Sequence, residues 1–111
     1  MEIQEHRHGA VTVVRPDGPL VQDDAERFRS RINDVLGRSL GRFVVDASAV
    51  PYVDSVGLEV LADLTQELGH SGQALKLCGA TETVREILDL TELTTLFEHY
   101  EDVQTAVRNF L

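Results

Sequence analysis

The apolar run Phe43-Val44-Val45 limits the fold of this chain more than any other feature of its sequence. Two of its three side chains are β-branched and none is polar, so a strand made from them offers no face to water. Such a strand has to be covered on both faces, which places it in the middle of a sheet. Asp46 ends the run, and we expect its carboxylate to accept hydrogen bonds from nearby loop N–H groups.

Helical periodicity appears on both sides of this strand. Apolar residues at three- and four-residue steps predict an amphipathic helix over 23–36, with Asp23 or Asp24 as its cap. A second helix is predicted after the loop 47–54 and ends near Gly69 and Gly72. Its expected buried face consists of Leu58, Leu61, Ala62, Thr65 and Leu68.

The rest of the chain continues this alternation. An opening hairpin is predicted from strands at 1–7 and 10–15 joined at His8-Gly9, and Pro16-Asp17-Gly18-Pro19 then predicts a turn. The later predicted elements are a strand over 74–78, a helix capped by Thr81, a strand over 96–100 and a terminal helix carrying Val103, Val107 and Phe110. This order predicts one α/β domain over residues 1–111, with a mixed, mainly parallel β-sheet and packed α-helices.

The balance of charge narrows the choice of partners. Nineteen acidic and ten basic side chains give a net charge of −9 and a pI of about 4.7, which repels nucleic-acid phosphates and anionic lipid. The single cysteine, Cys78, cannot form an internal disulfide, and no apolar stretch resembles a membrane span or a secretory signal. We therefore expect a cytoplasmic protein that binds neither nucleic acid nor a membrane.

The most informative segment runs from Val44 to Leu58, through a strand and a loop into the start of a helix. It ends in the pattern Asp-Ser-x-Gly-Leu at positions 54 to 58. This pattern, together with the order of elements along nearly the whole chain, resembles the STAS domain. That domain is shared by anti-sigma-factor antagonists, stressosome scaffold proteins and the cytosolic tails of sulfate transporters.

The resemblance implies a switch controlled by phosphorylation. In antagonists of this family, the serine after the aspartate is phosphorylated by the anti-sigma factor that the antagonist binds, and the match places this role on Ser55. Only the unphosphorylated antagonist binds that kinase tightly, which releases a sigma factor and so regulates transcription. The implied partners are an anti-sigma factor with serine kinase activity and a phosphatase for Ser55. Whether the protein also forms a weak homodimer stays open. The expected partner-binding residues are Asp54, Ser55, Val56, Gly57, Leu58 and Glu59.

The alternative is a STAS subunit that acts by assembly in a stressosome-like or transporter-associated complex. The lack of a sensor module and of a membrane span in this sequence favours the free antagonist.

The residue types of the motif also have a direct physical interpretation. Ser55 lies at a predicted helix amino terminus, where unpaired N–H groups and the helix dipole favour an added phosphate by roughly 0.3 to 1 kcal/mol. Taken without the motif, Ser55 would be an unmodified helix cap. Asp54 is expected to cap the helix, and Gly57 either lets a partner approach the backbone or serves the geometry of the helix start.

One position departs from the family pattern. Many antagonists carry an acidic residue soon after the glycine of the first strand-to-helix turn, and here Val21 occupies that position. Asp23 or Asp24 is the nearest substitute. The departure puts in doubt the nucleotide contacts suggested for some members and leaves the serine switch untouched.

Enzymatic alternatives find little support. The nucleophile elbow of a serine hydrolase, Gly-x-Ser-x-Gly, is not present around Ser55, because Val53 occupies its first glycine position. The sequence also contains no Gly-rich loop for binding the phosphates of a nucleotide. His6 and His8 share one strand face but have no third ligand nearby, and Cys78 in an apolar strand indicates a buried, inert thiol. We therefore predict a non-enzyme without cofactor or metal.

Overall fold

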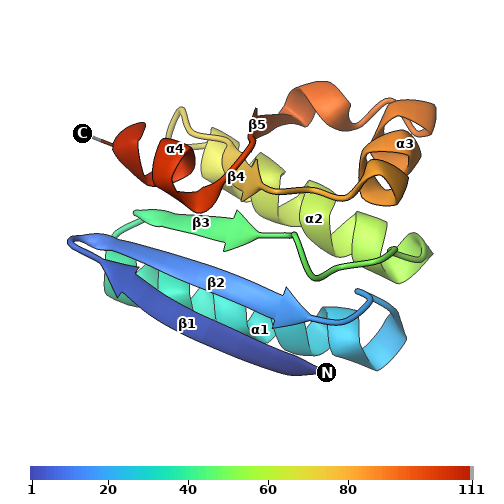
Figure 1. The fold of residues 1–111 in the computed structure, drawn as a ribbon, viewed down its shortest axis with the longest axis horizontal. Helices are drawn as coiled ribbons and strands as arrows, with labels where there is room; N and C mark the ends of the chain where they lie inside the picture. The colour runs from blue at the N-terminus through green and yellow to red at the C-terminus, as the bar shows by residue number, and fades with distance from the viewer. Residues whose placement is uncertain (111) are drawn as a thin grey trace.

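The computed structural model describes residues 1–110 and contains one five-stranded sheet in the order β1-β2-β3-β4-β5. β1 pairs with β2 in the antiparallel direction, and all other neighbours are parallel (Figure 1). The strands are β1 (Glu2–His8), β2 (Val11–Asp17), β3 (Phe43–Asp46), β4 (Leu75–Cys78) and β5 (Phe97–Tyr100). The helices are α1 (Gln22–Ser39), α2 (Ser55–Gly69), α3 (Glu82–Leu90) and α4 (Val103–Arg108), with a 3-10 turn at Thr94–Leu96. The predicted α/β fold with a mixed, mainly parallel sheet is confirmed.

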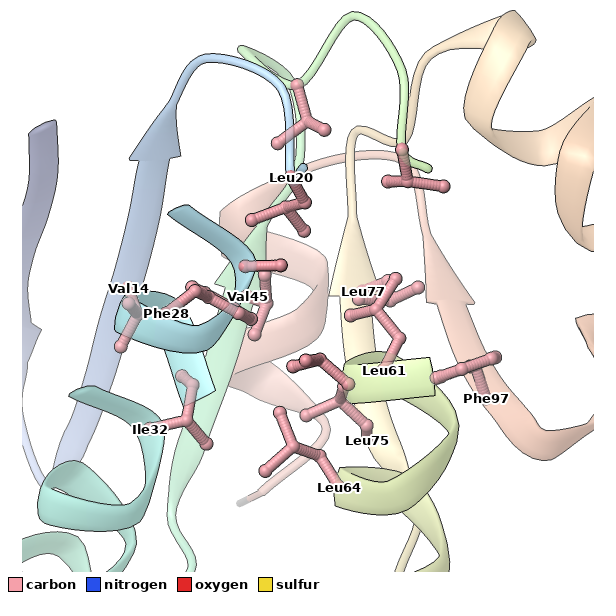
Figure 2. Close-up of a cluster of buried hydrophobic side chains, with 14 of the residues drawn as sticks. Val14, Leu20, Phe28, Ile32, Val45, Leu61, Leu64, Leu75, Leu77 and Phe97 are labelled. Carbon is pink, nitrogen blue, oxygen red and sulfur yellow. The ribbon is translucent and has the colours of Figure 1, made fainter. Parts of the chain in front are cut away.

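Two apolar cores lie on the two faces of this sheet. The larger one joins α1, α2 and α3 to the sheet, and Figure 2 shows side chains of α1 and α2 pointing toward those of the strands. The smaller one lies under α4, where Ala106 packs with Val44 and Cys78. Val44 is fully buried, and its neighbours Phe43 and Val45 turn to the larger core. The prediction of a central strand covered on both faces is therefore confirmed.

The buried face of α2 differs from the expected one. Val60 and Leu64 are buried, whereas Leu58 and Ala62 are only half-buried. Leu61, Thr65 and Leu68 lie on both the expected and the observed face. The apolar residues of this helix extend beyond one narrow stripe, so their spacing alone allows more than one face to be chosen.

β2 continues through Pro16 and Asp17, where the sequence predicts a turn. The backbone nitrogen of Thr12 donates to Arg42 O and therefore faces β3. Backbone nitrogens face the same side of a strand at every second residue, so the nitrogen of Pro16 faces β3 as well. Pairing with β3 has already ended at Val14, and the missing N–H of Pro16 therefore removes no ladder hydrogen bond. On the other side, pairing with β1 extends to Asp17.

Other boundaries shift by a few residues. α1 begins before the predicted residue 23 and ends after 36, and the hairpin turn is at Gly9-Ala10 instead of His8-Gly9. Thr81 caps α3 as predicted, with its Oγ1 accepting from Val84 N at 3.3 Å. α4 ends at Arg108, so Phe110 packs against the smaller core from outside the helix. Within residues 1–110, no helix combines the length and the apolar character needed to cross a membrane.

Candidate functional site

The carboxyl ends of β2, β3 and β4 meet the amino termini of α1, α2 and α3 at one end of the sheet (Figure 1). Backbone hydrogen bonds tie the loops at this end together. Gly18 N donates to Ala49 O at 3.1 Å, and Leu20 N donates to Tyr52 O at 3.2 Å. Leu20 also forms a parallel bridge with Val53. The loop between β3 and α2 is therefore fixed by the loop that precedes α1.

Asp54 caps two helices at once. Its Oδ1 accepts from Gly57 N at 2.8 Å in the first turn of α2, and its Oδ2 accepts from Gln22 N at 3.0 Å at the start of α1. Gln22, the donor of the second bond, has a left-handed backbone conformation with a φ of 43°. Glutamine rarely adopts this conformation. The predicted capping by Asp54 is confirmed, whereas Asp23 and Asp24 lie inside the first turn of α1 and do not precede it as a cap.

Gly57 is buried against the loop before α1. A β-carbon at this position would lie 2.2 Å from the carbonyl oxygen of Leu20 and 3.2 Å from the Leu20 Cβ. That carbonyl also accepts a hydrogen bond from Asp54 N at 3.2 Å. The missing side chain therefore makes room for the protein's own backbone, a reason that neither of the two sequence interpretations of Gly57 contained.

Ser55 is exposed and is the first residue of α2. The first backbone hydrogen bond of the helix runs from Leu58 N to Asp54 O at 2.9 Å, so the N–H groups of Ser55 and Val56 precede the ladder and lack a partner within it. An anion attached to Ser55 would meet these groups and the positive end of the helix dipole. Because Asp54 is the N-cap, the interpretation of Ser55 as the helix cap is wrong, and the modification of Ser55 stays a prediction.

The residues predicted to bind a partner differ in exposure. Ser55 and Glu59 are exposed, while Val56 and Leu58 are half-buried and pack against the larger core. Sequence reasoning missed Tyr52, whose side chain is 49% exposed in the loop just before the motif. An aromatic residue in the loop beside the motif was the signal that could have identified it, since exposed aromatic side chains are frequent anchors of protein interfaces.

Asp23 and Asp24, the acidic residues near Val21, differ in exposure and in hydrogen bonding. Val21 is half-buried before the first turn of α1. Asp24 accepts a hydrogen bond from Arg27 at 3.3 Å, while Asp23 is exposed. Asp23 is therefore the carboxylate of this pair that is free to contribute negative charge to the surface at this end of the sheet.

The two remaining sequence candidates at this end have structural roles. Asp46 Oδ1 accepts from Ser48 N at 3.0 Å, which confirms the predicted loop-starting aspartate. Cys78 is fully buried, and its Sγ lies 3.5 Å from the Val45 carbonyl oxygen. Burial, with smaller contributions from the carboxylates of Asp46 and Asp102, raises the pKa of the Cys78 thiol to about 12. Within residues 1–110, His, Cys, Asp and Glu form no group of three or more that could hold a metal ion.

The protonated Cys78 thiol leads to a prediction about reactivity and pH. We expect iodoacetamide to leave Cys78 unmodified in the folded protein and to label it once the protein is unfolded in urea. The folded thiol keeps its proton at a pH where the unfolded thiol, with a pKa of 9.0, has lost it, so the free energy of unfolding should fall as pH rises from 9.0 toward about 12. Mass spectrometry after labelling checks the first part, and rapid labelling of the native protein would contradict it.

The double capping by Asp54 leads to a prediction about stability. Asp54→Ala removes both hydrogen bonds and should lower the free energy of unfolding by about 2 kcal/mol, since each lost cap costs about 0.5 to 2 kcal/mol. Asp54→Asn keeps one acceptor oxygen and should lose about half as much. Asp23→Ala is the matched control, because its carboxylate is exposed. Urea unfolding measures all three, and equal stability of Asp54→Ala and Asp23→Ala would refute the double cap.

Comparison with known proteins agrees with the fold described above. The STAS domain profile matches residues 2–106. The anti-sigma-F factor antagonist RsfB of Mycobacterium tuberculosis is 29% identical over 103 residues, which cover 91% of this chain and 84% of RsfB. The crystal structure of an anti-sigma factor antagonist from Mycobacterium paratuberculosis has a TM-score of 0.79 at 27% identity, over 97% of this chain and 92% of that chain.

Similar structures also exist for SpoIIAA, an anti-sigma factor antagonist. Its unphosphorylated form has a TM-score of 0.77 at 18% identity, over 98% of this chain and 96% of that chain. The phosphorylated form of the Bacillus protein has a TM-score of 0.72 at 17% identity, over 99% of this chain and 100% of that chain. With the profile match across nearly all of its length, this chain belongs to the STAS domain family.

Proposed function

We propose that this protein is an anti-sigma-factor antagonist whose binding to an anti-sigma factor is controlled by phosphorylation of Ser55. The observation that carries the proposal is an exposed serine at the first position of α2, beside a carboxylate cap that is already hydrogen-bonded. Two relatives named as antagonists, RsfB and SpoIIAA, support it, and SpoIIAA has both an unphosphorylated and a phosphorylated form. The protein acts in the cytoplasm and by binding, without catalysis of its own.

The fold is compatible with a phosphate on Ser55. The N–H groups of Ser55 and Val56 are outside the hydrogen-bonded ladder of α2, and the helix dipole favours negative charge there by roughly 0.3 to 1 kcal/mol. Both oxygens of the neighbouring Asp54 accept backbone hydrogen bonds, which offsets the repulsion between its carboxylate and the phosphate. Phosphorylation therefore changes the surface and leaves the domain folded.

The proposed partner surface is the start of α2 with the loop before it, made of Asp54, Ser55, Val56, Gly57, Leu58 and Glu59. Ser55 and Glu59 supply its exposed side chains, and Tyr52 adds an exposed aromatic ring. Gly57 contributes by holding the helix close to Leu20. A partner that covers Ser55 would meet about 1.5 to 2 negative charges after phosphorylation, which gives the modification its effect.

Phosphopeptide mapping tests which serine is modified. After incubation with the cognate anti-sigma kinase and ATP, we expect phosphate on Ser55, and treatment with the cognate phosphatase should remove it. Ser48 is the matched internal control, because it is also exposed in the loop before α2. Modification mainly at Ser30, Ser39, Ser48 or Ser71 would overturn the assignment to Ser55.

Co-purification from the native cell tests the class of partner. Mass spectrometry of the captured proteins should identify an anti-sigma factor with serine kinase activity. Capture of a large scaffold or a transporter in its place would favour the alternative, a STAS subunit that acts by assembly.

A further inference from the structure

A pocket lies beside the β1–β2 turn, the end of α1 and the start of β3. These three segments lie at the opposite end of the sheet from the start of α2 (Figure 1). The pocket has a volume of about 390 Å³, which is within the range of small-molecule sites. Its lining residues are Glu5, Arg7, Ala10, Thr12, Arg38, Ser39, Leu40 and Arg42. We call this surface the arginine pocket.

The arginine pocket carries positive charge that the described residues do not neutralise. Six of the ten basic residues form ion pairs within residues 1–110, and Arg7, Arg42, Arg85 and Arg108 do not. Two of these four, Arg7 and Arg42, line this one pocket. Arg7 donates to the Gly9 carbonyl oxygen at 3.2 Å, which leaves its charge unbalanced. This concentration of charge is unexpected in a chain with a net charge of −9.

The acidic residue in the lining is already neutralised. The carboxylate of Glu5 accepts from Arg31 at 3.0 Å and from Arg38 at 2.8 Å, and Arg38 also pairs with Asp34 at 3.2 Å. The lining therefore keeps two positive charges, those of Arg7 and Arg42, that form no ion pair in the described part of the chain.

An unpartnered hydroxyl group completes the lining. Ser39 Oγ is buried and has no hydrogen-bond partner in residues 1–110. Proteins rarely retain such a group unless something else satisfies it, because a buried polar atom without a partner is destabilising. The Oγ is covered in the unliganded protein, so a ligand oxygen in the pocket would provide that partner once the Ser39 side chain rotates toward it.

We propose that the arginine pocket binds a phosphoryl group, either as free phosphate or as part of a small phosphorylated molecule. Two guanidinium groups match the charge of a phosphate dianion, and the planar fork of arginine donates paired N–H bonds to phosphate oxygens. The Ser39 hydroxyl supplies a further hydrogen bond. The site is independent of the Ser55 switch, because the two lie at opposite ends of the sheet.

The test is a titration followed by NMR amide signals, with inorganic phosphate and glycerol 3-phosphate as probes and potassium chloride at matched ionic strength as the reference. We expect saturable shifts around residues 7–12 and 38–42 with at least one of the two phosphate probes. Tighter binding of glycerol 3-phosphate would identify an esterified ligand, and tighter binding of inorganic phosphate would identify the free ion. Equal, non-saturating shifts with phosphate and chloride would overturn the proposal.

Variants distinguish a specific phosphate site from a general effect of positive charge on phosphate affinity. The double variant Arg7→Gln/Arg42→Gln should weaken binding of phosphate by at least about tenfold, whereas Arg85→Gln, which removes an exposed unpaired arginine elsewhere, should change it less than about twofold. Ser39→Ala should weaken binding while raising the melting temperature, because the unpartnered hydroxyl is removed. Unchanged affinity in the double variant would show that the arginines do not form the site.

Discussion

Replacing Gly57 with alanine is expected to lower the free energy of unfolding by about 3 kcal/mol, the upper end of the usual cost of overpacking. The new β-carbon would lie 2.2 Å from the carbonyl oxygen of Leu20, and that oxygen belongs to the backbone, so it cannot rotate away as a flexible side chain can. Relief requires α2 to move from the loop before α1. We expect this movement also to weaken the hydrogen bonds between Asp54 and the two helices.

Thermal and urea unfolding measure this effect. For a domain of this size, 3 kcal/mol corresponds to a fall in melting temperature of roughly 10 to 20 °C. Gly69→Ala is the matched control, because Gly69 is in the same helix and a β-carbon there would meet no atom within 4 Å. Alanine there should be neutral or stabilise by up to about 1 kcal/mol. Equal stability of the two variants would show that α2 and the Leu20 loop can separate at little cost.

Features that depend on a few neighbouring residues were predicted well from the sequence. Asp46, Asp54 and Thr81 each accept a backbone N–H two or three residues later, and such short-range bonds follow from side-chain length and position alone. The buried run at Phe43–Val45 was equally clear, because nothing polar interrupts it. The position of Ser55 beside the Asp54 cap could therefore be predicted before the fold was known.

Features that depend on distant residues were not predictable in the same way. The bond from Gln22 N to Asp54 and the contact of Gly57 with Leu20 join segments more than thirty residues apart. No local pattern indicates which loop will lie over α2, so the sequence left the role of Gly57 open. Pro16 is a similar case: it stays in β2 only because β3 has already ended beside it.

The buried face of α2 shows a further limit of local patterns. With Leu58, Val60, Leu61 and Leu64 all apolar, two overlapping stripes satisfy helical periodicity. The close approach of Gly57 to Leu20 is consistent with the observed face, because a buried Gly57 has Val60, Leu61 and Leu64 at the three-, four- and seven-residue steps along the helix.

Ser55→Asp is expected to weaken binding of the anti-sigma factor by roughly 100-fold or more. Under the partner, the added carboxylate is either undersolvated or in contact with a like charge, and a like-charge contact near 4 Å is worth about 4 kcal/mol at an effective dielectric constant of 20. Each 1.4 kcal/mol is tenfold in affinity. The fold should persist, because an acidic side chain is favourable in the first turn of a helix. This expectation rests on the proposed function, in which the partner covers Ser55.

Ser55→Ala should bind with affinity close to that of the wild type and resist phosphorylation. Its free energy of unfolding should change by less than about 0.5 kcal/mol, because Asp54 and not Ser55 caps α2. Calorimetric titration of the partner into the wild type, Ser55→Ala, Ser55→Asp and Ser71→Asp separates a local effect from one of net charge. Ser71→Asp adds the same charge at an exposed position beyond the other end of α2 and should leave affinity nearly unchanged. Equal affinity of Ser55→Asp and Ser71→Asp would show that the partner does not cover the start of α2.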